Sequence, residues 1–172
     1  GRARVMRAYI DHILALLPFE PAVHRRLGGP PCTYVGHPLV EQVNNLRPSA
    51  EEARRRLALP PILLVLPGSR SGEIERLLNT FAQAVDLVHE RLGSLEVVVA
   101  TVPHLAEAVR NATARWPLQP RIVVETADKQ AAFRVATAAL AKSGTVTLEL
   151  ALAGVPMIAA YSIRARVRLR DH

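Results

Sequence analysis

Short apolar runs rich in β-branched residues alternate along this chain with stretches of helical periodicity. The runs are uniformly apolar rather than alternately apolar and polar, which is typical of strands buried on both faces. Strands joined through helices form a parallel sheet covered by helices, so the sequence predicts an α/β fold. The predicted strands are residues 12–16, 33–35, 62–66, 95–100, 121–124, 138–141 and 157–160.

The clearest predicted helix spans residues 72–92. Its apolar side chains fall at spacings of three and four, so one face can pack on the sheet. Further helices are predicted over residues 21–27, 49–59, 103–115, 128–135 and 145–153.

A boundary between two units is predicted near residues 36–48. Residues 1–36 are interpreted as the end of one domain, 37–60 as a linker and helix, 61–163 as the body of the next domain, and 164–172 as a basic tail. The chain begins with Gly1 rather than Met, and both ends resemble truncations. We therefore expect a site built from two domains to be half present.

Basic residues outnumber acidic ones, 22 to 15, giving a net charge of +7. Lys129 and Lys142 are the only lysines, so all the other cations are arginines. Arginine favours bidentate contacts with phosphate or carboxylate, which indicates an anionic partner; a solvated surface is the alternative. Aromatic residues make up only 4%, which weakens any interpretation based on stacked single-stranded bases.

Metal, cofactor and membrane signals are missing from the sequence. Cys32 is the only cysteine, and the histidines have no metal-ligand spacing, so we expect neither a metal nor a cofactor. The longest apolar stretch, residues 150–163, contains Gly154 and Pro156 and falls short of the roughly 20 residues that a bilayer requires. We predict no transmembrane helix and no signal peptide.

The first candidate binding loop follows the third predicted strand. Gly68 lets a ligand approach the backbone, Ser69 offers a hydroxyl, and Arg70 adds a charge at the start of a helix, where unpaired N–H groups favour an anion. The loop has neither the Walker nor the GxGxxG pattern. The alternative is a plain turn, because Glu73 and Glu75 already complement the helix dipole and would repel a phosphate.

The second candidate loop follows the sixth predicted strand. Ser143, Gly144 and Thr145 place two hydroxyls around a glycine at a helix start, with Lys142 as a nearby cation. Glu149 faces the same mouth if the helix begins near Thr145, and a carboxylate suits a ribose diol; an exposed helix residue is the alternative. Ligands of parallel sheets bind at the carboxyl ends of the strands, and a nucleotide diphosphate is long enough to touch both loops.

Four segments together resemble the C-terminal half of the lipid-A-disaccharide synthase family of Gram-negative envelope synthesis. They are DHILALLPFEP, YVGHPLVE, LLVLPGSRSGEIERLL and AKSGTVTLELALAGVPMIAAY, and the resemblance covers residues 9–163. It implies a two-domain GT-B glycosyltransferase whose C-terminal, nucleotide-binding domain is a Rossmann-like parallel sheet with helices on both faces. It also implies the reaction: inverting transfer of 2,3-diacylglucosamine from UDP to 2,3-diacylglucosamine 1-phosphate, giving lipid A disaccharide and UDP.

The same resemblance implies roles for eight residues, partly by analogy with the UDP-GlcNAc transferase of peptidoglycan synthesis. Both loops would hold the diphosphate, the helix after the second loop would bind the ribose, and a backbone segment would read the uracil edge. The diphosphate role falls on Gly68, Ser69 and Arg70 of the first loop and on Ser143, Gly144 and Thr145 of the second. The ribose role falls on Glu149, and the uracil role on the backbone near Thr126. Fixed dipoles and Arg70 would stabilise the departing diphosphate without a metal.

The general base of the family belongs to the N-terminal domain, most of which precedes Gly1, so no residue of this chain is assigned that role. We expect the chain to bind UDP and to have little or no transferase activity alone. The implied partners are UDP-2,3-diacylglucosamine, a lipid-linked acceptor sugar, the inner-membrane surface and a second copy of the chain, but no nucleic acid. The implied location is cytoplasmic, peripheral on the inner membrane.

Two alternatives stay open at this point. Another GT-B enzyme of UDP-sugars, such as a UDP-GlcNAc 2-epimerase, would share both loops. In a basic binding module, Arg164, Arg166, Arg168 and Arg170 would instead form a patch for nucleic acid or lipid headgroups. Few aromatics and no recognised reader motif weigh against the module, whose binding of nucleic acid would fall steeply with salt.

Overall fold

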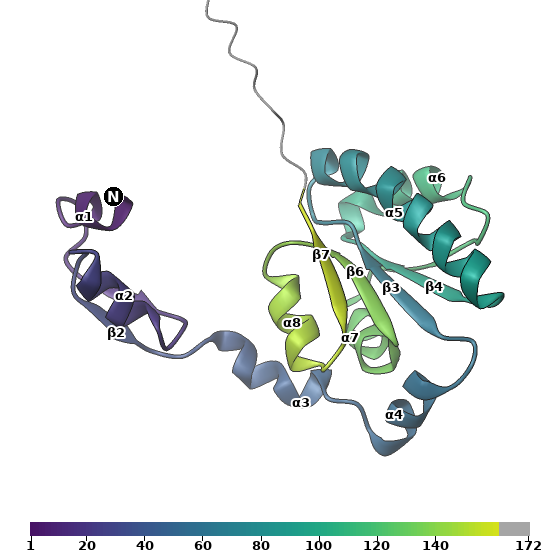
Figure 1. Cartoon of the computed structure of the whole chain (residues 1–172), viewed down its shortest axis with the longest axis horizontal. Helices are drawn as coiled ribbons and strands as arrows, with labels where there is room; N and C mark the ends of the chain where they lie inside the picture. Colours follow the sequence, from purple (N-terminus) through teal and green to yellow (C-terminus); the bar gives the residue numbers. More distant parts are fainter. Residues whose placement is uncertain (162–172) are drawn as a thin grey trace, which may run out of the picture. The chain divides into compact units, whose positions relative to one another are not determined.

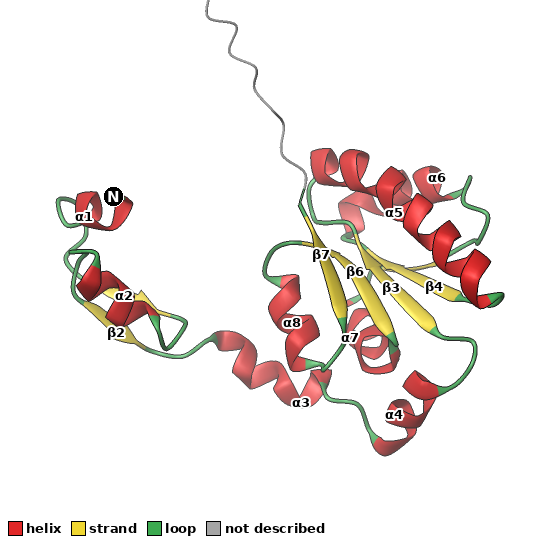
Figure 2. Cartoon of the chain, viewed as in Figure 1, coloured by secondary structure: helices red, strands yellow, loops and turns green. Residues whose placement is uncertain are grey.

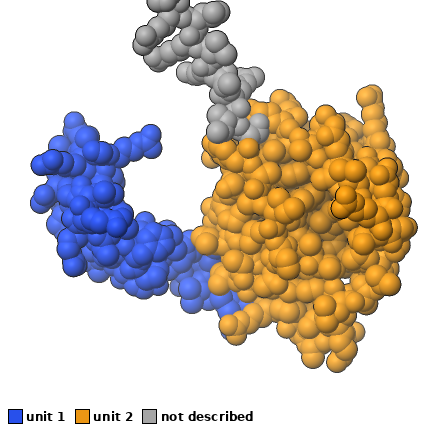
Figure 3. Space-filling model, viewed as in Figure 1, with its two compact units in different colours: residues 1–44 blue, residues 45–172 orange. Residues whose placement is uncertain are grey.

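The computed structural model describes residues 1–161, which fall into two compact units (Figure 3). The first unit is Gly1–Asn44, and the second begins at Asn45. The predicted basic tail, 164–172, lies outside the described residues. The assignment of 1–36, 37–60 and 61–163 to an acceptor domain, a linker and a nucleotide domain stays a prediction.

The smaller unit is built around two short parallel strands. Strands β1 (Ile13–Ala15) and β2 (Cys32–Tyr34) pair, and helix α2 (Glu20–Arg26) lies between them in the chain. Helix α1 (Arg2–Met6) precedes them. Within residues 1–44 only Ala15 and Pro30 are buried, so this unit has almost no core of its own.

The segment predicted as a boundary contains two short helices that the sequence analysis missed. The 3-10 helix η1 (Pro38–Gln42) runs directly into α3 (Val43–Leu46). His37 begins the first of these, because its Nδ1 accepts a hydrogen bond from the Leu39 N–H at 3.1 Å. Leu46, the last residue of α3, is buried in the core of the larger unit.

The larger unit is a five-stranded, all-parallel sheet with helices on both faces (Figures 1 and 2). The strand order is β5-β4-β3-β6-β7, the doubly wound arrangement in which the chain works outward from a central strand and then crosses back to that strand's other side. The strands are β3 (Ile62–Leu66), β4 (Glu96–Ala100), β5 (Arg121–Val123), β6 (Ala138–Lys142) and β7 (Met157–Ala160).

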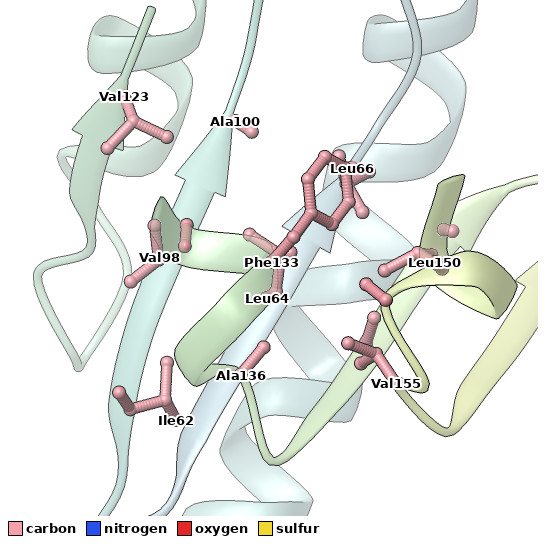
Figure 4. Close-up of a cluster of buried hydrophobic side chains, with 14 of the residues drawn as sticks. Ile62, Leu64, Leu66, Val98, Ala100, Val123, Phe133, Ala136, Leu150 and Val155 are labelled. Carbon is pink, nitrogen blue, oxygen red and sulfur yellow. The ribbon is translucent and has the colours of Figure 1, made fainter. Parts of the chain in front are cut away.

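Two separate cores lie on the two faces of this sheet. On one face, Leu63 and Val65 of β3 pack against α5 (Ser71–Leu92) and α6 (Ala106–Thr113). On the other face, α7 (Thr126–Val135) and α8 (Val146–Leu152) cover the remaining residues of β3; Phe133 of α7 and Leu150 of α8 belong to this core (Figure 4). Burial on both faces is why β3 is apolar at every position.

The predicted elements agree closely with the structure. Each of the seven predicted strands is present, with ends that differ by one residue at most. The predicted helix 103–115 is wrong in detail, because its first turn is the 3-10 helix η2 (Pro103–Leu105) and only residues 106–113 are α-helical. The short α1 was not predicted.

Helix α4 (Ala50–Leu57) is fastened to the far ends of α7 and α8 by Arg56. The Arg56 guanidinium donates to the carbonyls of Phe133, Arg134, Ala153 and Gly154 at 3.0–3.1 Å. The last carbonyls of a helix have no partner within the helix and carry its negative dipole end. One cation therefore satisfies the carboxyl ends of two helices.

We expect Arg56→Ala to lower the free energy of unfolding by about 2–3 kcal/mol, because four hydrogen bonds from a charged group to carbonyls are lost, three of them partly buried. Urea denaturation measures this change. Arg54→Ala is the matched control, since Arg54 is exposed on the same helix and makes no side-chain hydrogen bond within residues 1–161. Equal effects of the two substitutions would contradict a stabilising role for the four Arg56 hydrogen bonds, which we call the Arg56 clamp.

Candidate functional site

The two predicted loops follow neighbouring strands at the point where the chain changes direction across the sheet. Strand β3 pairs with β6 in a register that aligns Leu66 with Ala141, so the two strands end side by side. The connection after β3 passes through α5 on one face, and the connection into β6 passes through α7 on the other. Ligands of doubly wound sheets bind outside the carboxyl ends of the strands at such a switch point.

A carboxylate links the two loops. Oε1 of Glu73 lies 3.0 Å from Lys142 Nζ at the end of β6 and 3.0 Å from Arg70 Nη1. Its Oε2 accepts a hydrogen bond from the backbone N–H of Ser69 at 3.3 Å. The Glu73 side chain is only 12% exposed, against 78% for Arg70. As expected for the alternative interpretation, an acidic residue of the first turn complements the start of α5.

Hydrogen bonding from the Lys142 ammonium lowers the pKa of Glu73, with further contributions from Arg70 and the Ser69 N–H and an opposing one from burial. The carboxylate is therefore ionised at neutral pH. Its contribution to stability is present above its unfolded pKa and disappears as the pH falls through the lower folded value.

Gly68 is required at its position by the backbone conformation. Its φ of +115° is a conformation that residues with a side chain rarely adopt. A Cβ at this position would also lie 2.5 Å from Oε2 of Glu73. The glycine thus leaves room for an oxygen of the Glu73 carboxylate close to the backbone; the approach of a ligand at this position stays a prediction.

The second loop is open to solvent. Ser143, Gly144 and Thr145 are all exposed, and α8 begins directly after them. The Ser143 N–H is already used, because it donates to the carbonyl of Ala160 at 2.8 Å. The Thr147 hydroxyl donates to the Gly144 carbonyl at 2.6 Å and holds the turn. The hydroxyls of Ser143 and Thr145 stay available to a ligand.

Glu149 lies on α8 on the same face of the sheet as α7. Burial raises the pKa of Glu149, opposed by the positive charge of Lys129 on α7. Glu149 is therefore not the exposed helix residue of the alternative interpretation. Thr126 is the exposed first residue of α7, and no side-chain hydrogen bond within residues 1–161 joins it to either loop.

The ion pair between Lys142 and Glu73 was not predicted from the sequence. The rarity of lysine singled the residue out, since the chain has only two lysines among its many arginines, but nothing in the sequence indicated its partner. Both lysines belong to this region: Lys142 ends β6, and Lys129 influences Glu149. A compact ammonium fits between two loops more easily than a guanidinium does.

Two hollows lie against α5, the smaller near its start and the larger along the helix from Ser71 to Asp86. A small one of about 80 Å³ is lined by Glu73, Arg76, Leu77, Lys142 and Tyr161. A larger one of about 530 Å³ lies between α5 and α6, and none of residues 68–70 or 142–145 lines it. The described residues contain no group of three or more His, Cys, Asp or Glu side chains arranged to hold a metal, and no helix among them is long and apolar enough to cross a membrane.

Comparison with known proteins gives a consistent match. The sequence model of the family described as lipid-A-disaccharide synthetase matches residues 1–166. The lipid-A-disaccharide synthase of Nitrobacter winogradskyi is 63% identical over 161 residues, which cover 94% of this chain and 41% of the relative. That of Rhodopseudomonas palustris strain HaA2 is 61% identical, over 96% and 42% respectively. That of Ruegeria pomeroyi is 44% identical, over 95% and 43%. The chain thus spans about two fifths of the length of these relatives.

We expect Glu149→Gln to raise the melting temperature at pH 7.5. The folded chain raises the pKa of this carboxyl, so its ionisation costs stability as the pH climbs above the unfolded value. The gain should shrink toward pH 4, where Glu149 is protonated. Thermal melts across this range test the prediction. Glu107→Gln, at an exposed position in the first turn of α6, should give no gain; equal shifts in both variants would contradict the effect of burial.

Proposed function

The chain belongs to the lipid-A-disaccharide synthetase family, and we propose that it is the UDP-sugar-binding part of a glycosyltransferase of lipid A biosynthesis. The observation that carries this proposal is the coincidence of two findings. Residues 1–166 match the family, and the two glycine loops follow the neighbouring strands at the switch point of the sheet. The match favours this enzyme over a UDP-GlcNAc 2-epimerase and over a basic binding module, whose arginine patch lies outside the described residues.

The proposed reaction transfers 2,3-diacylglucosamine from UDP to 2,3-diacylglucosamine 1-phosphate with inversion. As the bond between the anomeric carbon and the diphosphate oxygen breaks, negative charge accumulates on UDP. Prearranged donors at this oxygen lower the barrier because they need no reorganisation during the reaction. In our proposal Gly68, Ser69 and Arg70 act on one side of the diphosphate, and the loop at residues 143–145 acts on the other.

We assign the ribose hydroxyls to Glu149 and the uracil edge to the backbone near Thr126. Two observations support this direction for the nucleoside. The positive charge of Lys129 lowers the pKa of Glu149, and Lys129 lies about one turn into α7, the helix that begins at Thr126. Both helices also cover the same face of the sheet. A GT-B arrangement would bring the acceptor and the general base to this edge from a second domain.

The remaining assignments concern the whole enzyme. The relatives are more than twice as long as the matched region, and we place the general base in their unmatched part. Both proposed sugars are acylated, so we propose that the enzyme works on the cytoplasmic side of the inner membrane as a peripheral protein, with a homodimer as its assembly. No cofactor or nucleic acid enters this proposal.

We expect Arg70→Ala to weaken UDP binding by about 1.5–3 kcal/mol, roughly tenfold or more, because a charged donor to the diphosphate is lost. Isothermal titration calorimetry of UDP into the 172-residue chain measures this. Arg91→Ala removes the same charge from the other end of α5 and should leave the affinity unchanged. Unchanged affinity in Arg70→Ala would remove Arg70 from the site.

We also expect the 172-residue chain to bind UDP without catalysing transfer, because no carboxylate of this chain is assigned to activate the acceptor. The measurement is the release of UDP from UDP-2,3-diacylglucosamine in the presence of the acceptor, 2,3-diacylglucosamine 1-phosphate. The full-length relative from Nitrobacter winogradskyi serves as the positive control. Sustained turnover by the chain alone would show that the general base lies within it.

A further inference from the structure

The position expected for a phosphate at the first loop is held by an acidic side chain of the protein itself. Glu73 takes a hydrogen bond from the Ser69 N–H and pairs with both Lys142 and Arg70. A backbone amide at a helix start, an ammonium and a guanidinium are the donors that bind phosphate in proteins. The carboxylate therefore uses the same donors that a diphosphate would need.

A diphosphate and the Glu73 carboxylate cannot share this position. Glu73 Oε2 occupies the space over Gly68, as shown by the 2.5 Å that would separate it from a Cβ there. Two like charges this close together repel strongly where water is partly excluded. Water is largely excluded from the Glu73 side chain, which is only 12% exposed. The diphosphate can reach the loop only if the carboxylate leaves.

On the basis of the function proposed above, we propose that UDP binds by anion exchange: Glu73 holds the diphosphate position in the free chain, and the incoming diphosphate displaces it and takes over Lys142 and Arg70. Lys142 is thereby a diphosphate-binding residue, and Glu73 is a positioning residue that keeps the two cations in place while no UDP is bound. Both cations therefore have an anionic partner before the exchange and after it.

The structure offers a place for the displaced carboxylate. Arg76 is one helical turn beyond Glu73, at the i,i+3 spacing at which side chains meet on a helix surface. Both residues line the small hollow of about 80 Å³ together with Lys142 and Tyr161. A change of side-chain rotamer in Glu73 toward Arg76 would vacate the space over Gly68 and supply a new ion pair.

The direction in which one substitution changes the affinity for UDP tests the exchange. Glu73→Gln removes the competing charge, so we expect calorimetry to show UDP binding at least roughly threefold more tightly than to the unaltered chain. The same variant should melt at a lower temperature without UDP, because the ion pair with Lys142 is gone. Glu75→Gln is the matched control: it removes one negative charge from an exposed position on the same turn and should change neither quantity appreciably.

A second variant tests Lys142 separately. Lys142→Met should weaken UDP binding about tenfold or more, and it should do so in the Glu73→Gln background as well, because the loss is a direct contact with the diphosphate. If Lys142 merely held Glu73 in place, the second substitution would have no effect in that background. Melting curves establish that each variant is folded, and the Glu73→Gln result decides the exchange on its own if Lys142→Met is unfolded.

The outcomes separate this inference from the proposed function. If the unaltered chain binds UDP but Glu73→Gln binds it equally or more weakly, Glu73 is a fixed partner of Lys142; the exchange is then wrong and the proposed function stands. If Glu75→Gln tightens binding as much as Glu73→Gln, the effect is general electrostatics, and the exchange is again wrong. If the unaltered chain does not bind UDP, the proposed function fails and the exchange fails with it.

Discussion

Burial of strand β3 from both sides is the constraint on which the rest of the larger unit depends. Every residue of β3 is buried, with alternate side chains entering two different cores. A strand in this position needs helices on both faces and a partner on each edge. Once β4 and β6 lie on its two edges, the helical connections leave on opposite faces, and the loops at residues 68–70 and 143–145 therefore follow neighbouring strands.

The sequence predicted the elements better than their arrangement. Uniformly apolar runs such as residues 62–66 identify strands, and the glycines after them identify the loops, because both signals are local. The expectation that one diphosphate reaches both loops required β3 and β6 to be neighbouring strands, and the structure confirms that they are. The register that aligns Leu66 with Ala141 depends on packing between distant segments, so it could not be read from the sequence. For the same reason Glu73 could be read as a helix-start residue, but its contact with Lys142 could not. The helices at residues 38–46 were not predicted because they are short and because the burial of Leu46 is a tertiary contact.

The two units differ greatly in how much apolar surface they remove from water. Residues 1–44 leave large side chains such as Tyr9 and Phe19 mostly exposed, at 84% and 60%. The larger unit has two cores that enclose its sheet. Hydrophobic burial dominates stability, so cooperative unfolding of this chain reports on the larger unit, where the candidate site lies. Changes in melting temperature caused by residues of the site are therefore readable without a contribution from residues 1–44.

The Arg56 clamp has a mechanical consequence for that site. Arg56 grips the carboxyl ends of α7 and α8, whereas Thr126 and the loop at residues 143–145 lie at their amino ends. Helix α7 has ten residues and is about 15 Å long at 1.5 Å per residue. A helix held at one end can tilt about that end but cannot shift along its own axis. A tilt of either helix about the guanidinium would therefore displace Thr126, at the amino end of α7, further than Glu149, which lies midway along α8.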